Sequence, residues 1–135
     1  MRRRSHLADG YAAPVGVFRD LEAVAPQAIW DGLLARAVHG HRITLAVVEV
    51  DPGADLPEHA HDNEQVGVVI RGSLVLRVGS DERTLDPGGT YVIPSRTPHA
   101  GRGGPEGAVV ADVFTPPRAD WETIDRQEPR RPLWP

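Results

Sequence analysis

The sequence of 135 residues has no cysteine, which excludes a disulfide framework, a thiol nucleophile and a thiolate metal ligand. No apolar run approaches the roughly 20 residues that a membrane-spanning helix needs. The formal net charge of −4 provides no overall positive field for nucleic acid or an anionic membrane. The chain starts with a basic stretch, residues 1–6, but no apolar segment follows it, as a signal peptide would require. We therefore expect a cytoplasmic protein with no nucleic-acid or membrane partner.

Turn-forming residues are abundant instead. The 14 glycines and 13 prolines favour short strands joined by turns over long helices, and the length suits one domain. Residues 42–50 are rich in β-branched side chains and end at an Asp-Pro-Gly turn, so they form the clearest predicted strand. Further strands are expected at residues 65–70, 74–78, 83–85, 90–93 and 108–114, with a turn at residues 71–73. This spacing predicts an all-β fold, an antiparallel sandwich or barrel.

Three histidines and one glutamine have the spacing of a metal site. His59 and His61 are two residues apart, and alternate residues of a strand point to the same face. Gln65 has the same parity and can offer an amide oxygen, while His99 follows another short apolar strand. Three imidazoles and one amide oxygen suit a borderline divalent ion such as Zn, Ni, Mn or Fe, with coordination positions left for water or substrate.

These residues resemble the two motifs of the cupin superfamily. The first motif is matched by Gly53, five residues, His59-Ala-His61, three residues, Gln65, six residues and Gly72. The second is matched by residues 85–99, which contain a Pro-Gly turn and an Ile-Pro pair before His99. The resemblance covers roughly residues 30–120. It implies a double-stranded β-helix, or jelly-roll barrel, of antiparallel sheets with one metal near an open end.

Two departures from the cupin pattern affect the ligand set. Gln65 stands where the family usually has Glu, and Gly89 stands where many relatives have Asp. A shift of one residue would offer Glu64 to the metal instead, but Glu64 has the wrong parity and breaks the six-residue gap to Gly72. We therefore prefer Gln65. A neutral amide ligand leaves the charge of the ion uncompensated, which favours Lewis-acid chemistry.

Residues near the end of the predicted barrel are candidates for catalysis. Asp112 interrupts an apolar strand and shares parity with Phe114, so it is a general acid or base if that face is the interior, and otherwise an edge-strand charge. Arg118 can clamp a substrate carboxylate over the mouth, or is an ordinary surface cation. The segment 112–121 also resembles the end of the pectin-degradation cupins, which convert unsaturated uronates to linear keto forms. That resemblance implies functional roles for Asp112, Phe114 and Arg118. Polyketide cyclase cupins are similar as well.

The expected activity is therefore metal-dependent ring opening, keto–enol isomerisation or cyclisation of a small oxygenated molecule. An iron-dependent dioxygenase and a binding or sensor module without turnover are the alternatives. The resemblance and the open sheet edges also imply a homodimer.

The remaining expectations concern boundaries and packing. Residues 1–13 are predicted to be a flexible arm, residues 14–120 the barrel, and residues 121–135 a Pro-rich tail that wraps the barrel or is partly disordered. Residues 28–39 fit a helical stripe interrupted by glycine, and the resemblance favours a strand at 34–38. His39 and His41 are expected to be exposed at a hairpin turn. Trp30 and Trp121 either line a binding mouth or pack in the core or at a dimer contact. The expected core residues are Val66, Val68, Val69, Ile70, Leu74, Leu76 and Val92.

Overall fold

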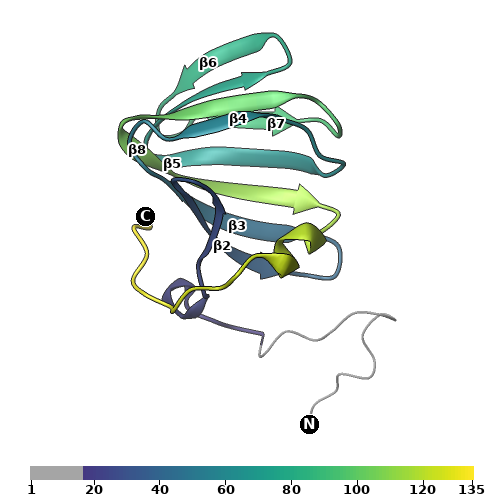
Figure 1. Ribbon diagram of the computed structural model, residues 1–135, viewed down its shortest axis with the longest axis vertical. Helices are drawn as coiled ribbons and strands as arrows, with labels where there is room; N and C mark the ends of the chain where they lie inside the picture. The colour runs from purple at the N-terminus through teal and green to yellow at the C-terminus, as the bar shows by residue number, and fades with distance from the viewer. Residues whose placement is uncertain (1–16) are drawn as a thin grey trace.

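The computed structural model describes residues 17–135, so the predicted N-terminal arm at residues 1–13 lies outside the described part. The described chain is an antiparallel β structure with two short 3₁₀ helices, η2 and η3 (Figure 1). No helix in this part of the chain is long and apolar enough to cross a membrane. In chain order the elements are η2 (Leu21–Ala23), β1 (Gln27–Trp30), β2 (Leu33–His39), β3 (Thr44–Val50), β4 (Asp55–His59), β5 (Glu64–Val78), β6 (Asp81–Leu85), β7 (Thr90–Ile93), β8 (His99–Thr115) and η3 (Ala119–Thr123).

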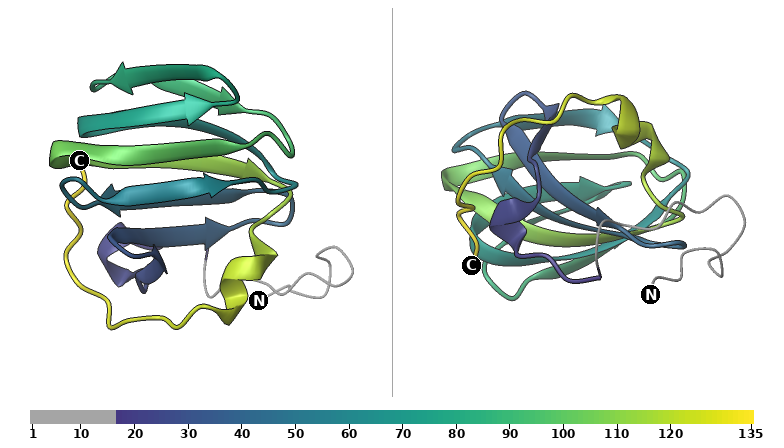
Figure 2. Two further views of the ribbon diagram at one scale, coloured as in Figure 1. Left: turned by 45° about the horizontal axis from the view of Figure 1, so that its top comes forward. Right: turned by 90° about the horizontal axis from the view of Figure 1, so that it is seen from below.

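Two long strands, β5 and β8, connect the two layers of the barrel. They pair with one another along most of their length. The first part of β5 pairs with β7 and the last part of β8 with β3, which gives a first sheet in the order β1-β2-β3-β8-β5-β7. The rest of both strands continues into a second sheet, β4-β8-β5-β6. The sheets face one another around an interior (Figures 1 and 2). The all-β prediction, a double-stranded β-helix of antiparallel sheets, is confirmed.

The turn predicted at residues 71–73 is wrong, because β5 runs through it. The pairing of β5 with β8 shifts register between Val69 and Arg71 and again between Gly72 and Leu74. Gly72 and Gly107 both have positive φ values, 75° in each case, and a Cβ on Gly72 would lie 2.1 Å from the Gly107 carbonyl oxygen. The two glycines therefore let the paired strands bend from one sheet into the other. The glycine-containing segment that was expected to reverse the chain therefore only bends a strand that continues.

The ambiguous segment at residues 28–39 is a β-hairpin. It forms β1 and β2 around a turn that contains Asp31 and Gly32, and Gly32 has a φ of 84°. The strand predicted at residues 34–38 is confirmed as part of β2. The glycine that interrupts the helical pattern is therefore the residue that permits the turn.

Alternation along the strands divides interior from exterior. In β5, Val69, Leu74 and Leu76 are buried, whereas Val66 is 46% exposed. In β7, Val92 is 57% exposed. The predicted core positions of Val66 and Val92 are therefore wrong, because both residues have the opposite parity to Gln65 and its partner Ile93 across the sheet.

The C-terminal segment packs on the barrel. Trp121, in η3, is buried and belongs to the hydrophobic core. Beyond it, Leu133 donates its backbone N–H to the Glu49 carboxylate at 2.8 Å, and Arg71 donates to the Leu133 carbonyl at 2.7 Å. The tail thus ends beside β5 and β8, where Figure 1 places the C-terminus. It covers Arg36 of β2, whose side chain is fully buried in an ion pair of 2.6 Å with Glu49.

Candidate functional site

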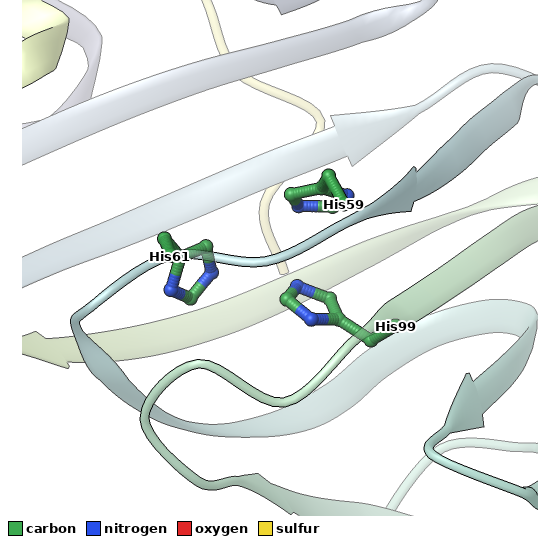
Figure 3. Close-up of side chains that lie close together, drawn as sticks. All are labelled: His59, His61 and His99. Carbon is green, nitrogen blue, oxygen red and sulfur yellow. The ribbon is translucent and has the colours of Figure 1, made fainter.

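The three predicted histidines meet inside one end of the barrel. His59 ends β4, His61 lies in the connection to β5, and His99 starts β8. Their potential ligand nitrogens all lie within 4.8 Å of one another, and Figure 3 shows the rings turned toward a common centre. His61 is not in a strand, so the predicted strand alternation is only part of the explanation. The strand β4 ends at His59, and the two residues that follow lie outside it, but the rings of His59 and His61 still face the same point.

The same backbone interaction orients each ring. The Nδ1 atoms of His59, His61 and His99 lie 2.9 Å from the Pro57 carbonyl oxygen, 3.0 Å from that of Asn63 and 2.9 Å from that of Thr97, respectively. A carbonyl oxygen only accepts hydrogen bonds, so each Nδ1 is assigned as the protonated nitrogen. Each Nε2 then carries a lone pair, which is the form that binds a metal ion.

The surroundings of His99 and His61 favour the neutral forms of these two imidazoles. Burial lowers the pKa of His99 from 6.5 to about 4, and it also lowers the pKa of His61, with a smaller contribution from the Arg118 charge. Because a neutral imidazole is the metal-binding form, these two histidines can bind a cation at neutral pH without first losing a proton.

Gln65 contributes an oxygen to this arrangement. Its Oε1 lies 3.2 Å from His61 Nε2, and its amide hydrogen-bonds with the Asp112 carboxylate. The amide nitrogen must be the donor to Asp112, which leaves the oxygen facing an imidazole nitrogen that also carries a lone pair. Two acceptors this close are best satisfied by a cation between them. Glu64, the alternative ligand, lies exposed in the first position of β5. The donor set therefore fits a divalent metal ion held by three histidines and Gln65.

Asp112 lies in the interior, on the same face as Phe114, as its parity predicts. It is 5% exposed, and the Tyr91 hydroxyl donates a 2.7 Å hydrogen bond to its Oδ1. Burial raises the pKa of Asp112 from 3.8 to about 6, although the hydrogen bonds from Tyr91 and Gln65 oppose the shift. Burial and the Asp112 charge also raise the pKa of Tyr91 well above 10. Asp112 can therefore exchange a proton near neutral pH.

Tyr91 and Gly67 are site residues that the sequence reasoning missed. A Cβ on Gly67 would lie 2.2 Å from Asp112 Oδ1 and 2.4 Å from Tyr91 Cζ. Only glycine therefore leaves room for the Tyr91–Asp112 pair at this place in β5. A glycine inside an otherwise β-branched strand is a sequence signal for close approach, whereas nothing in the sequence links Tyr91 with Asp112.

Arg118 lies over two aromatic rings and its side chain is 11% exposed. The guanidinium carbon is 4.8 Å from the centre of the Phe114 ring and 4.4 Å from that of Trp121. Its Nε and Nη2 donate to the Asp120 carboxylate at 3.1 and 2.9 Å. Asp120 therefore occupies the edge of the guanidinium formed by Nε and Nη2. Both N–H groups of Nη1 and the second N–H of Nη2 remain, so this end of the guanidinium can bind a substrate carboxylate.

The candidate ligands and catalytic residues line one cavity. Its volume is about 80 Å³, and it is lined by the three histidines, Gln65, Asp112, Phe114, Arg118, Trp30, Trp121 and apolar side chains of the sheets. A sugar-sized substrate would therefore have to extend out of the enclosed part. Trp30 is 38% exposed and its ring centre is 5.3 Å from that of His59, so it borders the cavity at the metal end.

The second His-x-His pair lies elsewhere. His39 was expected to be exposed, but it is half-buried and its Nδ1 is 2.8 Å from Thr44 Oγ1. His41 is exposed, as predicted. Neither histidine lines the cavity.

Comparison with known proteins agrees with this geometry. The family model described as "Cupin domain" matches residues 46–114, which include the three histidines, Gln65, Asp112 and Phe114. The chain therefore belongs to the cupin family. No curated protein sequence matches it significantly.

Solved cupin structures are similar over most of the chain. KdgF from Halomonas sp. is 27% identical, with a TM-score of 0.71 and coverage of 78% of this chain and 98% of that one. An RmlC-like cupin from Shewanella frigidimarina is 26% identical, with a TM-score of 0.73 and coverage of 78% and 96%. Bacillus subtilis oxalate decarboxylase, whose structure concerns its Mn(II) centres, is 21% identical, with a TM-score of 0.62 and coverage of 70% and 28%. At that identity, the last likeness concerns the fold alone.

Proposed function

We propose that this cupin is a metal-dependent enzyme that opens the ring of an unsaturated uronate and isomerises the product to its keto form. The proposal rests on one observation. The buried carboxyl group of Asp112 is hydrogen-bonded to the side chain of Gln65, and the amide oxygen of Gln65 faces the histidine cluster. The Gln65 side chain thus contacts both Asp112, which can carry a proton, and the candidate metal site. A divalent ion held there would supply Lewis-acid catalysis to a substrate oxygen.

The chain's own residues suit the proton transfers of this reaction. In a 4,5-unsaturated uronate, loss of the anomeric hydroxyl proton breaks the bond between C1 and the ring oxygen, giving an aldehyde and an enolate. Protonation at C4 then gives the 5-keto form, so one proton is removed and one is returned. Asp112, with a pKa of about 6, can perform both transfers in turn. Tyr91 holds one carboxyl oxygen of Asp112 in place.

Arg118 and the aromatic residues suit the acidic end of such a substrate. Arg118 Nη1 can bind the C6 carboxylate, because the stack on Phe114 and Trp121 fixes the guanidinium at the cavity. The resemblance of the segment 112–121 to the pectin-degradation cupins supports this choice of substrate class.

An NMR time course with a 4,5-unsaturated uronate monosaccharide tests the proposal. The metal-loaded protein should accelerate ring opening, whereas His61→Ala and Asp112→Asn should reduce the rate by roughly 100-fold or more. Asp81→Asn, an exposed carboxylate outside the cavity, is the matched control and should keep the full rate. Arg118→Lys should mainly raise KM.

Other outcomes would redirect the proposal. Equal rates for wild type and His61→Ala would remove the uronate reaction and leave polyketide cyclisation as the leading enzyme candidate. Oxygen-dependent turnover with bound iron would establish a dioxygenase. Ligand binding that Asp112→Asn leaves unchanged, with no turnover of any substrate class, would indicate a sensor.

A further inference from the structure

Asn63 lies between the histidine cluster and the stretch of chain that carries Arg118. It is the last residue of the connection between β4 and β5, and it is only 9% exposed. Its backbone carbonyl oxygen lies 3.0 Å from His61 Nδ1 and thereby orients that imidazole. Its side-chain amide donates a 2.6 Å hydrogen bond to the Pro116 carbonyl oxygen and a longer one, of 3.4 Å, to that of Pro117. One buried residue therefore contacts both parts of the site.

The partners of the Asn63 side chain determine its orientation. Both hydrogen bonds end at carbonyl oxygens, which only accept, so the amide nitrogen is the atom that faces them. At Pro116 and Pro117 the backbone has no N–H group, so this stretch can be held through its backbone only by its carbonyl groups. An aspartate in place of Asn63 would set an acceptor against an acceptor, although it has nearly the same shape.

The remaining contacts of the Arg118 segment, which we define as residues 116–124, attach it to β3 and to itself. The Arg118 N–H donates a 2.9 Å hydrogen bond to Oγ1 of Thr44, a fully buried residue of β3. The Trp121 N–H donates to the Arg118 carbonyl oxygen at 3.0 Å. The guanidinium and the ring on which it stacks thus belong to one segment, and the hydrogen bond from Asn63 joins that segment to the histidines.

The connection that carries His61 is also attached on another side. The Arg96 N–H donates a 2.7 Å hydrogen bond to the His61 carbonyl oxygen, and Arg96 has a φ of 60°, which is uncommon for a residue with a Cβ. The next residue, Thr97, accepts the hydrogen bond from His99 Nδ1. The backbone around two candidate ligands is therefore joined directly. When His61 and His99 hold one ion, this connection loses freedom, and Asn63 at its end is restrained with it.

We propose that Asn63 is a positioning residue that couples occupation of the metal site to the placement of Arg118. With a divalent ion bound, opening of the Arg118 segment has to break the Asn63 hydrogen bonds or disturb the connection to a ligand, so opening becomes rarer. In return, the closed segment favours ion binding. For a substrate carboxylate, this role rests on the proposed function of Arg118, whereas the coupling itself does not depend on any reaction.

Amide hydrogen exchange measures this coupling without a substrate. In the full chain, saturating Zn²⁺ should slow the exchange of the Arg118, Trp121 and Ile124 amides by roughly fivefold or more. Asn63→Ala removes the donor and keeps the backbone carbonyl group at His61, so Zn²⁺ should still bind stoichiometrically. In this variant Zn²⁺ should change the three exchange rates by less than about twofold.

Asn63→Asp is a second variant, which gives the test if Asn63→Ala does not fold. Its carboxylate would face the Pro116 carbonyl oxygen, so it should lose the effect of Zn²⁺ on exchange in the same way.

Thr123→Val is the matched control. It removes another side-chain hydrogen bond of the Arg118 segment, from Thr123 Oγ1 to the Asp120 carbonyl oxygen at 3.0 Å, and both of these residues lie in η3. The segment should exchange faster in this variant, but Zn²⁺ should slow the exchange by the same factor as in wild type. The Gln127 amide, which donates to the Pro26 carbonyl oxygen at 2.8 Å, should not respond to Zn²⁺ in any of these proteins.

Three results of the exchange measurement would each overturn the coupling: no effect of Zn²⁺ on the wild type, an effect of wild-type size in a folded Asn63 variant, or loss of the effect in Thr123→Val. Loss of stoichiometric zinc from both Asn63 variants would overturn it too, because Asn63 would then support the metal site alone.

Uronate kinetics separate this proposal from the proposed function. If the wild type opens the uronate ring, Asn63→Asp should raise KM by roughly tenfold and change kcat by less than about threefold, because the misplaced guanidinium weakens binding of the carboxylate. A metal-loaded wild type that does not open the ring would refute the uronate reaction, and the exchange measurement would still decide the role of Asn63.

Discussion

Asp112→Asn should stabilise the metal-free protein at neutral pH while it removes the proposed proton carrier. Asp112 has a pKa of about 6 in the folded chain, against 3.8 as its ordinary value, because burial disfavours the carboxylate. Folding raises the pKa of Asp112, so protonation of this carboxyl group stabilises the folded state. This contribution to the free energy of unfolding is fully present below about pH 3.8 and is lost as the pH rises through about 6. The difference between a pKa of about 6 and one of 3.8 corresponds to about 3 kcal/mol of stability lost at neutral pH, since a tenfold change in an equilibrium constant is about 1.4 kcal/mol.

Urea unfolding of the metal-free proteins at two pH values measures this effect. Between about pH 4 and about pH 7.5, the free energy of unfolding of Asp112→Asn should rise by about 2.5 kcal/mol relative to wild type. The comparison between pH values cancels any constant cost of the asparagine, such as a poorer contact with the Gln65 amide. Tyr91 can still donate its hydroxyl to the asparagine oxygen.

A second aspartate provides a control of opposite sign. The hydrogen bond from Arg118 lowers the pKa of Asp120, so its contribution is present above pH 3.8 and is lost as the pH falls. Asp120→Asn should therefore lose stability relative to wild type at neutral pH and not in acid. A difference between Asp112→Asn and wild type that is the same at both pH values would refute the reasoning about the buried carboxyl group.

Three further predictions test packing, the buried ion pair and the metal site. Gly67→Ala should destabilise the fold by about 3 kcal/mol in urea unfolding, because its Cβ would overlap the buried tyrosine–aspartate pair; an unchanged midpoint would contradict this. Glu49→Ala should cost about 3–5 kcal/mol, because it leaves a buried guanidinium unpaired and frees the tail, whereas Glu58→Ala removes an exposed pair and should cost about 1 kcal/mol or less. His99→Ala should abolish stoichiometric metal in elemental analysis with the fold retained, and His41→Ala should keep it; equal metal content would exclude the proposed ligands.

Features that depend on strand alternation or on the spacing of a short motif could be predicted from the sequence. Strand alternation predicts that Asp112 and Phe114 share one face, and the two cupin motifs bring His99 to His59 and His61. Parity also predicts that Gln65, and not Glu64, faces the histidines, although His61 lies in the connection between β4 and β5 and the count does not follow one strand. The shared face of Asp112 and Phe114 follows from the two-residue period of a strand, and the approach of the three histidines follows from the spacing of the motifs.

Only the tertiary structure decided how distant segments combine. Gly72 and Gly107 have the composition of turns, but pairing of β5 with β8 makes them bends, because each strand's hydrogen bonds are satisfied by a neighbour that is distant in sequence. Trp121 belongs to the predicted tail, yet its burial against Phe114 and Arg118 makes it part of the core and the cavity. Three features of the site also depend on the assembled barrel: the raised pKa of Asp112, the tautomers of the histidines and the ion pair of Arg118 with Asp120. They arise from burial and from the positions of hydrogen-bond partners, which no short stretch of sequence contains.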